Sequence, residues 1–392
     1  MNSHDGSSRR VLRQHTMVVG CLFVGVAVFS GPAKSQPPLP TMAEIEAKWR
    51  AREDKTPSFR VSWEARRTLP KGVFDIVVQL SGEPGKTGPA PRTDTIVDEK
   101  GALLVSGKKF RLDLDTTTWS VKEETIRPTS ITHVSDGVAY THYLRKSEVF
   151  EYGTAHQKKL DTKGAAPILQ PQVLVPVVLA FRGRDSYFAG RPLGEFHVKR
   201  RVPVSGRDCV ELVYESRSQN LTETLLLDTQ RDYIPLRAAT QSGNMVVSQV
   251  DITYVPVPEF GWVPQSWECV LRSSPTAIRE SCKVHKTTVE ILADPASGEE
   301  FQVALDPGSR VIDRTGEKVK HSVVRPDGSA GSSVAVGDGG RAPLYEDLVA
   351  KNDAQAQVNW YVWTAIGSVA VLVVLLTYRC WPRSSKPPVP AP

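Results

Sequence analysis

Hydrophobic and polar residues alternate with a period of two over most of the chain between residues 59 and 292. In the segment FRVSWEA, the apolar residues Phe59, Val61 and Trp63 fall on one side, as in a half-buried β-strand. Similar segments are 74–80, 109–113, 131–143, 196–203, 208–215, 223–227, 234–241, 246–254, 262–271 and 283–292. The turn-forming pairs Asp136-Gly137 and Ser242-Gly243 separate some of them. The pattern predicts a mainly β (α+β) fold with a curved antiparallel sheet or open half-barrel and one or two helices.

Two segments depart from the alternation and predict the helices. Thr41, followed by Glu44 three residues later, forms the capping box that opens a helix at MAEIEAKWRAR. The segment 167–181, PILQPQVLVPVVLAF, is apolar on almost every face, and Pro171 and Pro176 break or kink a helix there. Because so apolar a segment must be covered, we expect a plug on the concave side of the sheet or a contact with a membrane. An ordinary core helix is the alternative, and a plug is one form of it.

The amino-terminal region predicts an export signal. The uncharged run 16–30 follows three arginines, Arg9, Arg10 and Arg13, and is short for a spanning helix. We therefore expect a signal peptide within residues 1–35, with a retained N-terminal anchor as the alternative.

A second uncharged run, 360–378, predicts a membrane-spanning segment near the carboxyl end. At about 1.5 Å per residue these 19 residues form a helix of about 28 Å, close to the hydrocarbon thickness of a bilayer. We assign a single transmembrane helix to residues 358–379 and a short Pro-rich tail to residues 380–392. Arg379, Arg383 and Lys386 place this tail in the cytoplasm by the positive-inside rule. The main domain, 41–321, is then extracytoplasmic (periplasm-like), and residues 322–357 form a flexible tether that ends in a short polar helix.

Charge supports the membrane interpretation. The net charge of +6 comes entirely from basic residues beside the two apolar runs, and residues 37–357 are formally neutral. A nucleic-acid partner would need a clustered basic face, so none is expected.

Cysteine usage allows at most one disulfide within the exported domain, which contains Cys209, Cys269 and Cys282. Cys269 and Cys282 are the candidate pair, because their segments resemble two strands joined by a turn, and Cys209 would remain a buried thiol. The spacing of Cys282 and His285 resembles a metal motif but lacks further paired ligands, so neither a metal nor a cofactor is expected.

No motif of a hydrolase, nucleotide-binding protein or metalloprotease occurs in the chain. His133 and His142 can meet across the turn at Asp136-Gly137, but a catalytic pair would need a third group to orient one ring. We therefore expect no catalytic residue and a protein that is not an enzyme.

The order of these elements resembles the LolA-like superfamily, which includes periplasmic lipoprotein carriers, LppX-type lipid-binding proteins and RseB-type stress sensors. Three passages carry the resemblance. They are the helix and strand of residues 44–69, the hairpin 134–143, and the strand 224–228, which is followed by a second strand, 233–237, that contains Pro235. The resemblance implies an open half-barrel closed by helices around an apolar cavity for acyl chains or a hydrophobic peptide. The membrane anchor departs from the soluble carriers, and no family motif assigns a functional residue.

The leading functional hypothesis is a membrane-tethered, non-enzymatic domain that binds a lipid or lipoprotein acyl chain, or another apolar ligand. The candidate lining residues are Trp63, Phe74, Leu174, Val177, Val178, Leu179 and Phe181. An RseB-like envelope sensor with a protein partner is the alternative, and a structural envelope protein without a ligand is a third.

Overall fold

The computed structural model describes residues 37–73, 91–120, 123–160, 172–189, 191–258, 260–336 and 342–354. The predicted signal peptide 1–35, transmembrane helix 358–379 and tail 380–392 lie outside the described residues, as does Phe74. No helix within the described ranges combines the length and the apolar character needed to cross a membrane.

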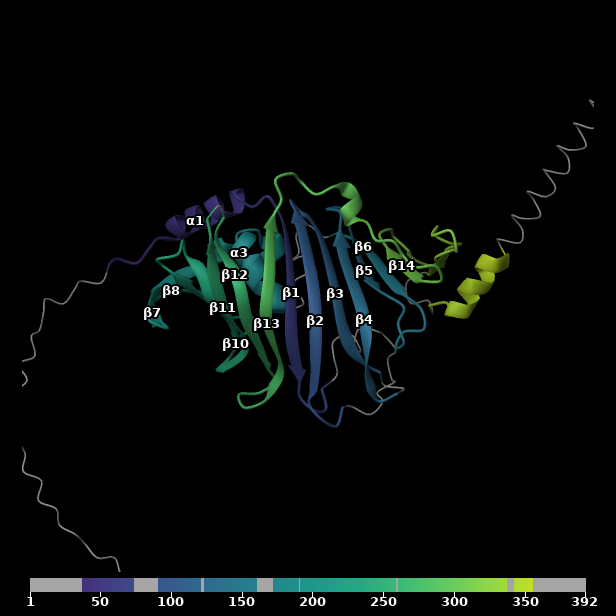
Figure 1. Ribbon diagram of the computed structural model, residues 1–392, viewed down its shortest axis with the longest axis horizontal. Coiled ribbons are helices and arrows are strands. Elements are labelled where there is room, and N and C mark those ends of the chain that lie inside the picture. The colour runs from purple at the N-terminus through teal and green to yellow at the C-terminus, as the bar shows by residue number, and fades with distance from the viewer. Residues whose placement is uncertain are drawn as a thin grey trace, which may run out of the picture. The chain divides into compact units, whose positions relative to one another are not determined.

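One antiparallel sheet dominates the described residues (Figure 1). Its strands are β1 (Ser58–Leu69), β2 (Thr95–Ser106), β3 (Lys109–Ser120), β4 (Thr125–Ser135), β5 (Ala139–Leu144), β6 (Thr154–Lys159), β7 (His197–Val204), β8 (Arg207–Ser216), β9 (Leu221–Asp228), β10 (Ile234–Ser242), β11 (Met245–Val257), β12 (Gly261–Arg272), β13 (Ile278–Ile291), β14 (Arg310–Arg314), β15 (Val319–Val323) and β16 (Val334–Val336). The helices include α1 (Met42–Asp54), α3 (Val175–Phe181), α4 (Ser186–Ala189) and a helical segment at residues 345–354, with 3-10 turns η2 (Gln172–Leu174), η3 (Leu193–Glu195) and η4 (Gly298–Phe301). The predicted class, mainly β with a curved sheet, is confirmed.

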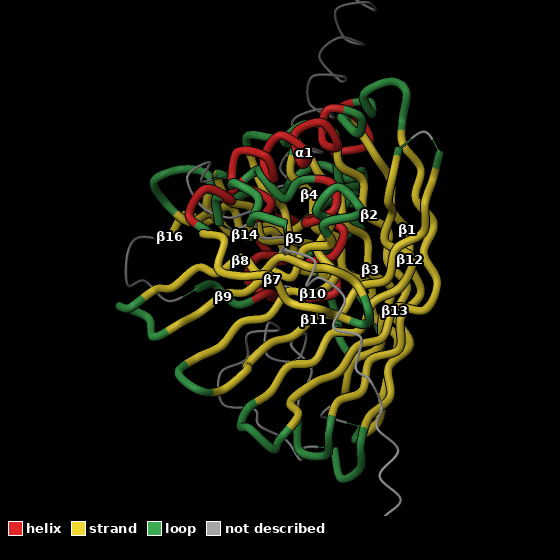
Figure 2. The backbone as a smooth tube through the Cα atoms, turned by 90° about the vertical axis from the view of Figure 1, so that its left-hand side faces the viewer, coloured by secondary structure: helices red, strands yellow, loops and turns green. Residues whose placement is uncertain are grey.

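The sheet has two arms that meet at β1. One arm runs through β2, β3, β4, β5, β6, β14 and β15 to β16, and the other through β13, β12, β11, β10, β9 and β8 to β7. Among the strands that the structure describes, every pairing is antiparallel except that of β6 with β14. Since β7 and β16 do not pair with each other, the sheet curves without closing into a barrel, and its strands fan around the helices in Figure 2.

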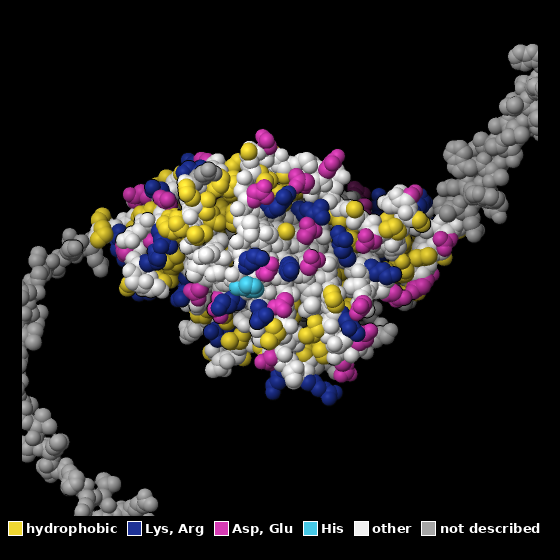
Figure 3. All heavy atoms as spheres, in the orientation of Figure 1, with side chains coloured by type: hydrophobic (Ala, Val, Ile, Leu, Met, Phe, Trp, Pro, Cys, Tyr) yellow, Lys and Arg dark blue, Asp and Glu magenta, His cyan; other side chains and the backbone are white. Residues whose placement is uncertain are grey.

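Alternation along the strands divides the sheet into an inner and an outer face. Phe59, Val61 and Trp63 of β1 point to the inner face, where α3 lies, and all three are buried. Side chains from both arms of the sheet join them around α3 in one core, which explains the period-two pattern of the sequence. The outer face carries basic and acidic side chains interspersed over β1, β2 and β13 (Figure 3), including the ion pair of Arg66 with Asp98.

Helix α1 begins at the predicted capping box. The Thr41 amide donates to Glu44 Oε2 at 2.6 Å, and the Glu44 amide donates to Thr41 Oγ1 at 3.2 Å. Ile45 and Trp49 of α1 then pack on β8 and β9 in a second core, and Trp49 Nε1 donates to the carbonyl of Tyr233 at 2.7 Å. The helix therefore covers the turn between β9 and β10.

The sheet continues into the region for which composition predicts a tether. Residues 322 and 323 complete β15, Val334–Val336 form β16, and residues 345–354 are helical. Asn352 of this helical segment holds the strands through hydrogen bonds with the Val323 carbonyl at 3.0 Å and the Ser332 amide at 2.8 Å. Long-range side-chain hydrogen bonds of this kind hold the described part of residues 322–357 in place, although its Gly- and Ser-rich composition predicts a flexible segment.

Candidate functional site

Helix α3 lies on the inner face of the sheet and is buried along almost its whole length. It begins at Val175, so that Pro176 occupies the first turn, where a missing amide proton breaks no helical hydrogen bond. Six of its residues, from Pro176 to Phe181, are buried, and the helix packs on β10, β11 and β12. The Phe181 ring also contacts that of Phe59 on β1, with centroids 4.8 Å apart. The described part of the apolar segment is therefore a plug on the concave side of the sheet, one of the two expected arrangements.

Most of the predicted lining residues come together around α3. Trp63, Leu174, Val177, Val178 and Phe181 belong to one core cluster, each at most 3 % exposed. Leu179 packs instead in the cluster of α1. The inner face and the plug thus form one continuous apolar body.

Polar contacts anchor α3 at its carboxyl end. Arg52 of α1 donates from Nε to the Ala180 carbonyl at 2.6 Å, and Arg182 donates from Nη1 to the Phe181 carbonyl at 2.6 Å. Burial lowers the pKa of both guanidinium groups. Glu53 accepts from the Arg184 amide at 2.8 Å and completes the junction. These contacts satisfy terminal carbonyls of the helix and place positive charge at its negative end.

The inner face changes character along the strands. In β3, Phe110, Leu112 and Leu114 occupy its first inner positions, and the last three are all hydroxyl residues. We call the part formed by Phe59, Val61, Trp63, Leu103, Val105, Phe110, Leu112 and Leu114 the apolar half. We call the part formed by Arg67, Thr95, Glu99, Thr116, Thr118, Ser120 and Thr129 the polar half, and all of its members are buried. Sequence reasoning missed the polar half, although the alternation of burial in β3 extends to Ser120.

Arg67 lies at the centre of the polar half and is 6 % exposed. Its guanidinium lies 3.6 Å from Glu99 Oε2 and 3.8 Å from Glu280 Oε1, and it donates to Thr116 Oγ1 at 3.3 Å. A buried charge requires such partners, because desolvation alone would cost several kcal/mol. The cluster therefore presents a guanidinium that is already engaged by carboxylates.

The candidate disulfide residues are register partners. Cys269 of β12 lies directly opposite Cys282 of β13, and both side chains are buried. Burial raises the pKa of both thiols, that of Cys282 to about 12. Directly opposite residues of an antiparallel pair have Cα separations of about 4.5–5.5 Å, within the range that a disulfide spans. The bond itself stays a prediction, and Cys209 is a buried free thiol as expected.

The predicted meeting of His133 and His142 is confirmed, and His156 extends it. The three residues are register partners on β4, β5 and β6, with ring centroids 4.6 and 6.1 Å apart. We call them the histidine ladder. His133 Nδ1 lies 2.6 Å from the Tyr140 hydroxyl. Desolvation and like-charged neighbours lower the pKa of His133 to about 3 and that of His142 to about 4. No three metal-ligating side chains of the described residues converge on one point.

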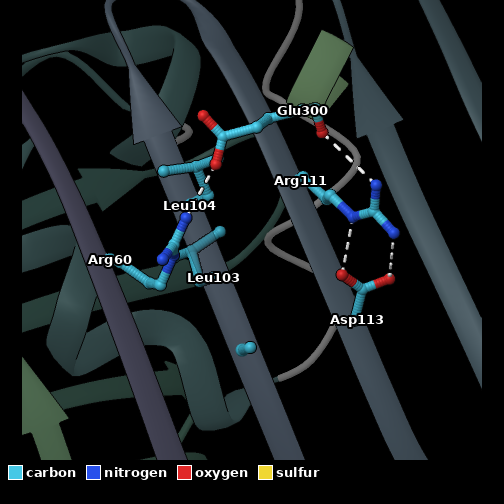
Figure 4. Close-up of a pocket in the computed structure, with 7 residues that line it drawn as sticks. Arg60, Leu103, Leu104, Arg111, Asp113 and Glu300 are labelled. Atoms are coloured by element: carbon cyan, nitrogen blue, oxygen red, sulfur yellow. Dashed lines mark hydrogen bonds and ion pairs between the residues drawn. The ribbon is translucent and has the colours of Figure 1, made fainter. Parts of the chain in front are cut away.

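A pocket of about 260 Å³ lies on the outer face, beside η4 (Figure 4). Its charged groups are already matched: Arg60 pairs with Glu300 at 2.7 Å, and Arg111 binds both carboxylate oxygens of Asp113. Ala102, Leu103 and Leu104 complete the lining. The pocket contains none of the predicted lining residues.

No family model matches the chain, and no curated protein matches it. Among solved structures, it is similar to a DUF1329 family protein from Desulfovibrio piger, with 10% identity, 68% of this chain and 100% of that chain covered, and a TM-score of 0.39. It is also similar to MucB in complex with MucA(peri), with 11% identity, 72% and 74% of the two chains covered, and a TM-score of 0.22. At these TM-scores the neighbours determine neither family nor function.

Proposed function

We propose that the chain is a membrane-tethered, non-enzymatic, extracytoplasmic binding module, and that an apolar ligand of the acyl-chain class exchanges with α3 on the inner face of its sheet. The observation that carries the proposal is the way α3 is held. Its body contacts the sheet through apolar side chains, and the hydrogen bonds that Arg52 and Arg182 donate to its carbonyls lie at the carboxyl end. The apolar runs at the two ends of the sequence support the membrane location.

The free energy gained by burying α3 on the inner face is similar to that gained by burying an acyl chain there. An acyl chain can therefore take the place of the helix. Burying a Val, Leu or Phe side chain contributes about 1.5–3 kcal/mol, so the buried side chains of α3 contribute on the order of 10 kcal/mol. An acyl chain of about 14 methylene groups, at about 0.8 kcal/mol each, contributes a similar amount. Neither contact is directional, and an acyl chain can therefore replace the helix on the same surface.

The first test is native mass spectrometry of the full-length protein purified without added lipid, followed by organic extraction. We expect a bound mass of several hundred daltons that behaves as an acylated molecule on extraction. A clean apo mass, unchanged after incubation with a palmitoylated lipid, would refute the proposal and favour a protein partner or a filled structural core.

Two matched variants test whether α3 competes with the ligand. Val177 of α3 and Val210 of the α1 cluster are both fully buried. Changing either to alanine removes the same atoms and costs about 2 kcal/mol of folding free energy. We expect Val177→Ala to tighten binding of a palmitoylated lipid by up to about thirtyfold, because the helix competes less strongly. Val210→Ala should leave affinity unchanged, and equal effects of the two variants would exclude competition by α3.

A further inference from the structure

Strands β6, β14 and β15, which are neighbours in the sheet, gather basic side chains on one face. We call these side chains the basic cluster: His156 and Lys158 of β6, Arg310 and Arg314 of β14, and His321 of β15. Lys158 lies directly opposite Arg314, and both histidines are register partners of Ile312, between the two arginines. Because register partners point to the same side, the row from His156 through the histidine ladder to Leu112 places the cluster on the inner face.

The members of the basic cluster interact with one another. Arg310 Nη2 lies 3.2 Å from His321 Nδ1. Burial, followed by the charges of Arg314 and Arg310, lowers the pKa of His156. Burial, followed by the charges of Arg310 and Arg314, likewise lowers the pKa of His321. Both guanidinium groups therefore lie close enough to the two rings to oppose a further positive charge there.

No carboxylate among the described residues balances these charges. The inner-face positions of β5, β6, β14, β15 and β16 hold no Asp or Glu. The three cations of the basic cluster form no ion pair with a described carboxylate. Arg310 Nη2 donates instead to the Pro343 carbonyl at 3.0 Å, and Arg310 Nε is buried without a partner in the described part of the chain.

The pairing of Lys158 with Arg314 places two like charges opposite each other, which destabilises a sheet. Elsewhere an arginine of the sheet faces an acidic register partner, as Arg237 faces Asp251. The Lys158 ammonium has a weak partner instead, the ring of Tyr140, whose centre is 5.3 Å away. Since Lys158 and Arg314 are both exposed, an anion from solvent can reach them and offset their repulsion.

We propose that the basic cluster is a binding site for a phosphate group, with Lys158, Arg314 and His156 as its direct donors. Arg310 adds positive charge from the other side of Ile312. A tetrahedral dianion suits these donors, because guanidinium and ammonium groups form their strongest hydrogen bonds with charged oxygens. The site lies on strands other than β10, β11 and β12, on which α3 packs, so it goes beyond the proposed function and requires no apolar ligand.

Titration of the full-length protein with sulfate tests the site, because sulfate has the tetrahedral shape of phosphate and stays a dianion near neutral pH. The measurement follows imidazole NMR signals, assigned with His156→Gln and His321→Gln, at an ionic strength held constant with chloride. We expect the signals of His156 and His321 to shift and to saturate. The signal of His285, which is exposed on the outer face, should not move.

Arg314→Gln and Lys320→Gln are matched variants, because each removes one exposed positive charge. Lys320 precedes His321 on β15 and therefore belongs to the outer-face set of that strand. Arg314→Gln should weaken sulfate binding by at least about tenfold, since a hydrogen bond from a charged donor is lost. Without sulfate, Arg314→Gln should be at least as stable as the wild type, because the like charge opposite Lys158 is gone. Lys320→Gln should leave sulfate binding unchanged.

Two phosphate esters distinguish the possible sources of the phosphate group. Methyl phosphate is soluble, whereas hexadecyl phosphate is presented in micelles of a neutral detergent. Equal binding of the two esters would indicate a soluble phosphate compound. Tighter binding of hexadecyl phosphate by about tenfold or more would indicate a head group at a membrane surface.

Three results would each refute the site. They are the absence of a shift at His156, equal shifts at His156 and His285, and equal loss of sulfate binding in Arg314→Gln and Lys320→Gln. The proposed function is tested separately by the bound lipid mass. A protein that binds sulfate at the basic cluster but carries no lipid would keep the phosphate site and lose the proposed function, and the converse result would do the opposite.

Discussion

Acid should destabilise the protein through the histidine ladder before most carboxylates titrate. Burial and neighbouring imidazoles lower the pKa of His133 to about 3 and that of His142 to about 4, from an ordinary value of 6.5. The native state thus keeps both rings neutral, whereas each ring of the unfolded chain takes up a proton as the pH falls through 6.5. Because the unfolded chain binds more protons in this range, lowering the pH favours unfolding.

The size of the effect follows from the two pKa shifts. Between pH 7 and pH 5, the titration of each of these two histidines lowers the free energy of unfolding by about 2 kcal/mol, or about 4 kcal/mol together. This is a large part of the about 5–15 kcal/mol that keeps a typical domain folded. Burial, followed by Arg314 and Arg310, also lowers the pKa of His156, which adds in the same direction.

The assay is denaturant unfolding of the full-length protein at pH 7, 6 and 5, followed by tryptophan fluorescence. Changing His142→Gln should reduce the loss between pH 7 and pH 5 to about 2 kcal/mol, because one titrating group is gone. His285→Gln is the control, since His285 lies exposed on the outer face. A wild-type loss below about 1 kcal/mol, or an undiminished loss in His142→Gln, would refute the buried, neutral ladder.

Two further predictions concern the inner face. A Cβ at Gly101 would lie 2.0 Å from Cζ2 of Trp63. Gly101→Ala should therefore lower the free energy of unfolding by about 1–3 kcal/mol, as measured by denaturant titration. Gly298→Ala is the control and should leave it unchanged, because a Cβ at Gly298 would meet no atom within 4 Å. Oxidative refolding should join Cys269 to Cys282 with the loss of two hydrogen atoms, detected by peptide mass mapping, and a bond to any other cysteine would contradict the register.

The sequence predicts the fold best where the inner face is apolar. In β1, Phe59, Val61 and Trp63 alternate with polar residues, and the predicted strand is present. In β2, inner positions include Thr95, Glu99 and Gly101, so the strand carries little apolar alternation, and periodicity alone misses it. The polar half of the inner face is thus the reason that one of the central strands is hard to recognise.

Long-range pairing limits prediction at the far end of the sheet. The parallel pairing of β6 with β14 joins residues more than 150 positions apart, and β14, β15 and β16 are short. Their positions depend on contacts such as the stacked rings of Tyr152 and Tyr345, with centroids 4.0 Å apart. Local composition contains no sign of such contacts. The pairing of His133 with His142 was accessible only because a short hairpin joins their strands.

The polar half also bears on the choice between a ligand-binding module and a structural protein with a filled core. Four buried groups without a partner among the described residues, on Trp63, Trp267, Thr118 and Thr129, would together cost about 4–12 kcal/mol. That penalty is comparable to the whole stability of a typical domain, about 5–15 kcal/mol. In a purely structural core, valine or phenylalanine at these positions would avoid it at little cost in packing. The hydroxyl and indole groups of this region therefore lower the stability of the fold relative to an all-apolar inner face, unless ordered water or a ligand supplies their partners.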